Sequence, residues 1–139
     1  MILNSQIKFP LGQIIIAPAA LTRLSVDEIL GALNRHVAGD WGDLGKDDRQ
    51  ENQISLETGH RLLSVYHSRT GTIFWVITEA DRSVTNIFLP ETHPDRDVGE
   101  TVRARVTDLK RKLNNSVLNN SLRKPVNVQP GLTFRFRAQ

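Results

Sequence analysis

The sequence predicts one α+β domain in which an antiparallel sheet of about four strands packs against N-terminal helices. Helical spacing of apolar residues and helix-capping signals occupy much of residues 18–58. Short β-branched and aromatic runs follow over residues 61–89. A length of 139 residues suits a single hydrophobic core. We therefore expect a core domain over residues 1–100 and a basic extension, a helix plus a strand, over residues 101–139.

The N-terminal part predicts a strand followed by a short helical turn. Residues 13–17 contain three consecutive β-branched isoleucines and lie between Gly12 and Pro18, which is typical of a buried or half-buried strand. Pro18 suits the first position of a helix, so a helical turn is expected through Leu24.

A longer helix is predicted over residues 26–38. Ser25 and Glu28 have the spacing of a capping box, in which each side chain bonds the backbone amide of the other residue. Gly39 provides a left-handed stop. The apolar stripe that recurs at helical spacing comprises Val26, Ile29, Leu30, Leu33 and Val37.

The next segment predicts an ordered loop and a surface helix. Residues 39–45 read GDWGDLG, so the loop must be ordered if Trp41 is buried. A second helix is expected over residues 47–58, with Asp47 and Gln50 as cap partners and Gly59 as its stop.

Three strands are predicted over residues 61–67, 72–79 and 83–89 because these runs are rich in β-branched and aromatic residues. Residues 68–71 read as a hairpin and residues 80–84 as a second connection. The expected arrangement is an antiparallel meander, with residues 13–17 adding the fourth strand.

The C-terminal part predicts a polar linker, a basic helix and a final strand. Residues 90–99 contain two prolines, and apolar residues then recur at helical spacing over residues 102–117. Residues 132–137 alternate strictly between apolar side chains and threonine or arginine. This alternation predicts a strand with one apolar and one cationic face.

Charge is divided unevenly along the chain. Residues 1–100 carry 9 Lys+Arg and 14 Asp+Glu, a net of −5, while residues 101–139 carry 9 Lys+Arg and one aspartate, a net of +8, which together give +3. Clustered cations of this kind favour a polyanion such as DNA or RNA. The alternative is that the basic extension folds against the acidic body. The expected nucleic-acid-binding residues are Arg103, Arg105, Lys110, Arg111, Lys112, Arg123, Lys124, Arg135 and Arg137.

Several classes of chemistry lose their usual sequence support. The absence of cysteine excludes disulfides, thiolate metal sites and cysteine nucleophiles. The four histidines do not form a metal-binding pair, and no phosphate-binding loop or nucleophile elbow occurs. We expect neither a metal nor a cofactor. No segment has the length of a membrane span or the pattern of a secretion signal, so a cytoplasmic location without membrane contact is expected.

One constellation could nevertheless support catalysis. His36, Arg61, Thr78 and Thr85 supply a base, a cation and hydroxyl groups, which metal-independent RNA cleavage requires. The alternative is structural: a histidine near a helix end is commonly packed, and Arg61 and Arg82 can pair with Glu79, Asp81 or the acidic loop.

Four features stand out from about His36 to Pro90: RHVAGDWGDL from Arg35, Asn52, GHRLLSVY from Gly59 and above all WVITEADRSVTNIFLP from Trp75. In these features the chain resembles a family of small uncharacterised proteins carried on bacterial plasmids and integrative elements, often labelled plasmid-related proteins. This resemblance implies a mobile-element setting and no particular activity. It does not extend to the basic extension.

Three functional hypotheses follow. The first is a non-enzymatic accessory or regulatory protein of a mobile element, which binds nucleic acid or a protein partner through its basic C-terminal region. The second is a small toxin-like ribonuclease that uses His36. The third is a protein inhibitor that acts through the acidic surface of the core.

Overall fold

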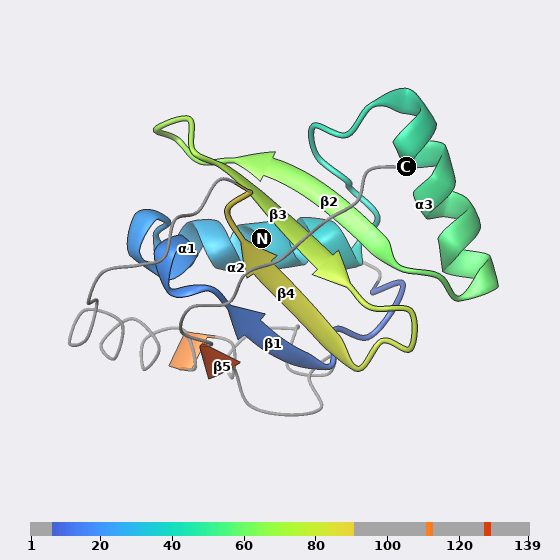
Figure 1. Ribbon diagram of the computed structural model, residues 1–139, viewed down its shortest axis with the longest axis horizontal. Helices are drawn as coiled ribbons and strands as arrows, with labels where there is room; N and C mark the ends of the chain where they lie inside the picture. The colour runs from blue at the N-terminus through green and yellow to red at the C-terminus, as the bar shows by residue number, and fades with distance from the viewer. Residues whose placement is uncertain (1–6, 91–110, 113–126, 129–139) are drawn as a thin grey trace.

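The computed structural model of the protein describes residues 7–90, 111–112 and 127–128. Its elements are β1 (Gln13–Ile16), α1 (Pro18–Arg23), α2 (Val26–Val37), α3 (Lys46–Thr58), β2 (Leu62–His67), β3 (Ile73–Thr78), β4 (Val84–Phe88) and β5 (Asn127–Val128). The helices and the mixed sheet form the predicted α+β arrangement, with α2 behind the sheet and α1 beside the strand ends in Figure 1.

Most of the extension lies outside the described residues. This applies to the strand predicted over residues 132–137, to the boundary predicted at residue 100, and to all of the helix predicted over residues 102–117 except Arg111 and Lys112. These two residues are helical.

The sheet contains five strands in the order β2-β3-β4-β1-β5. The pairs β2–β3 and β3–β4 are antiparallel, so the predicted meander is confirmed. Its register places Ser64 opposite Val76 and Val76 opposite Ile87. Because paired residues point to the same face, this row fixes which side chains face the helices.

The expectation that the whole sheet is antiparallel is wrong at β1, which pairs in parallel with β4 and places Ile14 opposite Thr85. The connection from β1 to β2 contains all three helices, and a helical crossover of this kind delivers the chain to a strand of the same direction. Two reversals through β3 then return β4 to the direction of β1.

The edge strand β5 was not expected from the sequence. It is only two residues long and pairs in parallel with β1, with Ile15 opposite Asn127 and Ile16 opposite Val128. A pair of residues is too short for an alternating pattern to reveal a strand. Its position brings the C-terminal part of the chain to the edge of the sheet.

The start of α2 agrees with its sequence signals, while the start of α3 does not. Both capping-box hydrogen bonds of Ser25 and Glu28 are 3.0 Å long. The predicted cap partners Asp47 and Gln50 are wrong because α3 begins after Gly45 and no side chain caps it. Asp47 therefore lies within the first turn, where its carboxylate complements the helix dipole.

The core lies between the sheet and the helices α1 and α2. Leu21, Ile29 and Leu33 are fully buried there, together with the strand residue Ile14. The helix α3 instead packs beside β2, as expected for a helix with few apolar residues. Trp41 is 5% exposed, so the glycine-rich loop is an ordered part of the fold.

Within the described residues, no helix combines the length and the apolar character that a bilayer crossing requires.

Candidate functional site

A line of polar side chains crosses the core between α2 and the sheet. His36 Nδ1 lies 2.6 Å from Ser64 Oγ on β2, and His36 Nε2 lies 2.9 Å from Thr78 Oγ1 on β3. Thr78 Oγ1 lies 2.7 Å from Thr85 Oγ1 on β4. The structure thus brings together three of the four predicted catalytic residues.

The end of this line fixes the direction of its hydrogen bonds. The hydroxyl of Thr85 donates to the carbonyl of Leu11 at 2.8 Å, so its only proton is used there. Thr78 must then donate to Thr85 and accept from His36 Nε2. Nδ1 of His36 consequently carries no proton and accepts from the hydroxyl of Ser64. The imidazole is held as a single neutral tautomer.

Burial and charge both oppose protonation of His36. The side chain has no exposed surface, and desolvation together with the nearby positive charge of Arg82 lowers its pKa to about 3. The ring packs edge-on against Phe9 and Trp41, at centroid distances of 5.1 and 5.8 Å. Buried on all sides, His36 cannot reach a bound phosphodiester in this structure.

The fourth predicted catalytic residue lies elsewhere. Arg61 is half exposed and its Nε donates to the Glu79 carboxylate at 3.2 Å. This pairing is the structural alternative expected for Arg61. The four residues therefore do not form one solvent-accessible site, and the hydroxyls of Thr78 and Thr85 are completely buried.

Arg82 has a structural role that the sequence did not reveal. Its backbone is left-handed, with φ of 61°, and its guanidinium donates to three carbonyl oxygens instead of pairing with a carboxylate. These acceptors belong to Ser55, His60 and Glu79. Arg82 thus ties the end of α3 to the turn between β3 and β4. A sequence offers no signal for such carbonyl acceptors.

Two of the nine predicted nucleic-acid-binding residues, Arg111 and Lys112, are described. Lys112 Nζ donates to Asp27 Oδ1 at 2.7 Å, and this contact lowers the pKa of the Asp27 carboxyl. The extension therefore contacts the acidic body at α2, as the alternative interpretation of its charge expects. Arg111 is exposed. The remaining seven residues lie outside the described part of the chain.

Other carboxylates of the body pair with the body's own groups. Arg35 binds Asp40 through both of its carboxylate oxygens and lowers the pKa of that carboxyl. Asp43 lies 2.8 Å from Nδ1 of His67. With the Arg61 pair, these contacts account for several carboxylates without any cation from the extension. They are solvent-exposed pairs, so each contributes little to stability.

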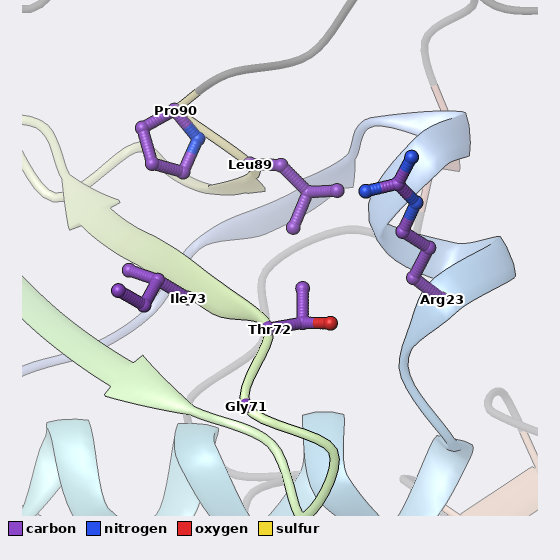
Figure 2. Close-up of a pocket in the computed structure, with 6 residues that line it drawn as sticks. All are labelled: Arg23, Gly71, Thr72, Ile73, Leu89 and Pro90. Atoms are coloured by element: carbon purple, nitrogen blue, oxygen red, sulfur yellow. The ribbon is translucent and has the colours of Figure 1, made fainter.

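A pocket of about 320 Å³ lies at one end of the sheet, away from His36. Figure 2 shows Arg23 reaching from α1 toward Leu89, while Thr72 points into the same space. Its other lining residues are Gly71, Ile73 and Pro90. One guanidinium and one hydroxyl beside apolar walls could hold a small anion with an apolar group. Within the described residues no cluster of histidine and acidic side chains suits a metal ion.

Sequence reasoning also missed Asn52. Its carboxamide nitrogen donates to the Leu63 carbonyl at 2.6 Å, and its oxygen accepts from the Leu63 amide at 3.2 Å. Asn52 therefore satisfies the free edge of β2 as a neighbouring strand would. An asparagine in a polar helix looks solvent-exposed in sequence, and only its 4% exposure reveals this role.

Comparison of the chain with protein-family models, with curated proteins and with solved structures finds no match.

Proposed function

We propose that the protein is a non-enzymatic accessory protein that binds a nucleic acid through its basic C-terminal region, in the cytoplasm of a bacterium that carries a mobile element. The observation that carries the proposal is the separation of charge in the sequence. Nine cations and a single carboxylate over residues 101–139 form a strongly cationic segment. A phosphate backbone is the polyanion such a segment neutralises most favourably, because binding releases condensed counterions.

The pairing of the body's charges supports this proposal. Asp40, Asp43 and Glu79 have cationic or histidine partners on the body, so these three contacts use no cation of the extension. Among the described residues, Lys112 connects the extension to Asp27 on α2.

The buried position of His36 favours a binding protein over a ribonuclease. A general base must reach the proton that it removes. His36 is enclosed by Phe9 and Trp41, and its ring nitrogens are already bonded to Ser64 and Thr78. Its pKa of about 3 also prevents it from donating a proton near neutral pH.

The test is fluorescence anisotropy of the full chain with labelled single-stranded and duplex DNA and RNA at several salt concentrations. We expect affinity to fall linearly with the logarithm of salt concentration. The double variant Arg135→Gln/Arg137→Gln should reduce that slope by about one for each phosphate contact removed.

The matched control is Lys46→Gln/Arg69→Gln, which removes the same charge from the body and should leave the slope unchanged. Equal effects of the two double variants would mean that only net charge matters, and the proposal would be wrong. Failure of any nucleic acid to bind at 20 mM salt would also contradict it.

A further inference from the structure

The sheet has a second face, which α1 and α2 do not cover. Register places Leu63, Ile77 and Asn86 in one row of this face, and Trp75 beside Phe88 in the next. We call these residues, with Val65 and Ile15, the outer face. In Figure 1 α2 lies behind the sheet, α1 lies beside the strand ends at the left and α3 lies beside β2, so no described helix lies across the outer face.

The centre of the outer face is nevertheless shielded from solvent. Ile77 is 1% exposed, Phe88 is 4% exposed and Asn86 is 6% exposed. Toward the β2 edge, Leu63 and Val65 are only half-buried. Strand neighbours alone leave the outward side of a sheet residue open to water. Because the outer-face residues of β3 and β4 are more buried than those of β2, we infer that a narrow segment of chain covers β3 and β4 and leaves β2 partly open.

Asn86 gives an independent reason to expect a peptide in that place. The residue is only 6% exposed, and no hydrogen bond joins its carboxamide to another of the described residues. A buried carboxamide without a partner is costly, because it loses its hydrogen bonds to water. An extended backbone supplies both an amide donor and a carbonyl acceptor. Asn52 and Leu63 show this pairing elsewhere in the same fold.

We propose that the outer face is the docking surface for the chain's own C-terminal segment, residues 131–137, lying across the sheet in extended form. Leu132, Phe134 and Phe136 would rest on the apolar strands, and the backbone between them would satisfy Asn86. The alternation of the segment then directs Arg135 and Arg137 away from the sheet.

The position of β5 makes this docking geometrically feasible. β5 ends at Val128, paired with Ile16 at the edge of the sheet. Crossing from β5 to β2 spans four strand spacings, about 19 Å at roughly 4.8 Å each. The 11 residues from 129 to 139 reach up to about 36 Å when extended. Pro130 and Gly131 provide the turn that such a path needs at its start.

This inference does not depend on nucleic-acid binding. It concerns the apolar side of the segment, whereas the proposed function concerns its cations. Either one can fail while the other holds, because they are tested by different side chains.

The test uses the absence of cysteine in the natural chain. Ile77→Cys places a thiol on the outer face, and Val76→Cys places one on the adjacent, helix-covered face; the two native side chains are 1% and 0% exposed. The rate of reaction with a small thiol reagent is measured for each variant in the full chain. Phe134→Asp and Thr133→Asp are then added separately, since both add the same charge and alternation places only Phe134 on the sheet.

Phe134→Asp should accelerate labelling of the Ile77→Cys thiol at least tenfold and leave the Val76→Cys thiol unchanged. Thr133→Asp should change neither rate. Equal rates with the two aspartates would overturn the proposal. So would labelling of the Ile77→Cys parent that accelerates on dilution, because a second copy of the chain would then provide the cover.

If Phe134→Asp accelerates both thiols, the fold as a whole has loosened. The milder Phe134→Ala, compared with Thr133→Ala, then decides the question by the same two rates. Selective exposure of the Ile77→Cys thiol by Phe134→Ala supports docking of the segment, and no selective exposure refutes it.

Discussion

The imidazole of His36 accepts a hydrogen bond from the hydroxyl of Ser64 across 2.6 Å, in a part of the core that water does not reach. This contact joins α2 to β2 and begins a chain of hydroxyls that ends at the Leu11 carbonyl. Burial lowers the pKa of His36, so the ring stays neutral and does not act as an acid or a base near neutral pH. Its hydrogen bonds instead connect α2 to β2, β3 and β4, and they depend on this neutral form of the ring.

Stability should fall in mild acid because of His36. Its folded pKa of about 3 lies below the ordinary value of 6.5, so its contribution is complete above pH 6.5 and is lost as pH falls toward 3. The loss should reach roughly 2 kcal/mol at pH 5. Urea unfolding at pH 7.5 and pH 5.0 measures it. His36→Gln should remove this part of the pH dependence, and an unchanged dependence in that variant would contradict the assignment.

Removing the hydroxyl of Thr78 should be more harmful than shortening the side chain. Thr78→Val leaves His36 Nε2 without its acceptor and removes the hydrogen bond that the Thr85 hydroxyl accepts, at a cost of about 2 to 4 kcal/mol in the free energy of unfolding. Thr78→Ser keeps the hydroxyl and should cost about 1 kcal/mol, for the lost methyl group. Equal destabilisation by both variants in chemical denaturation would mean that the hydroxyl contributes nothing.

Asn52→Leu should destabilise the fold and expose the edge of β2. The amide and carbonyl of Leu63 lose their bonds to the carboxamide, which should cost about 2 to 3 kcal/mol. Gln53→Leu, on the exposed neighbouring position, should cost less than about 0.5 kcal/mol. Thermal unfolding measures the stability of each variant, and light scattering measures its self-association. A stable and monomeric Asn52→Leu variant would contradict the edge-protecting role.

Gly42 should not tolerate a side chain, whereas Gly45 should. A Cβ at Gly42 would lie 2.1 Å from the Val65 carbonyl oxygen, and the backbone φ there is 74°. At Gly45 nothing lies within 4 Å of such an atom and φ is negative. Gly42→Ala should cost more than about 2 kcal/mol, and Gly45→Ala less than about 1 kcal/mol. Similar melting temperatures for the two variants would show that the loop does not require this close approach.

Neutralising Asp27 should strengthen binding of a polyanion. Asp27→Asn removes the carboxylate that accepts from Lys112, so one negative charge no longer competes with phosphate for that cation. Asp48→Asn is the matched control because Asp48 also lies in the first turn of a helix, and the change in charge is identical. Anisotropy titrations should give a lower Kd for Asp27→Asn than for Asp48→Asn. Equal values would assign the effect to net charge alone.

Local signals predicted local structure well. The capping box at Ser25 and the left-handed glycines at 39 and 59 were correct, since each acts through backbone atoms a few residues away. The meander was correct because hairpins join strands that are neighbours in sequence. The direction of β1 could not be derived in this way. It depends on the path of three helices between β1 and β2.

The candidate catalytic residues show the same limit. Sequence reasoning selected His36, Thr78 and Thr85 as groups able to act together, and they do lie within hydrogen-bonding distance. Residue types could not disclose that the cluster is sealed from solvent, because that depends on how Phe9 and the loop residue Trp41 pack around the ring. Arg61 was grouped with them by residue type, and its side chain pairs with Glu79 instead.

The β2 edge of the sheet is hydrogen-bonded by other parts of the chain. Along β2, the Val65 amide donates to the Trp41 carbonyl, and the Val65 carbonyl accepts from the Asp43 amide. The Asn52 carboxamide hydrogen-bonds the amide and the carbonyl of Leu63. The glycine-rich loop and α3 thus already occupy the hydrogen-bonding edge of β2, and an incoming strand of another protein would have to displace them. Pairing of a foreign β-strand with β2, from a partner or during aggregation, therefore requires that the loop or α3 first detaches from this edge.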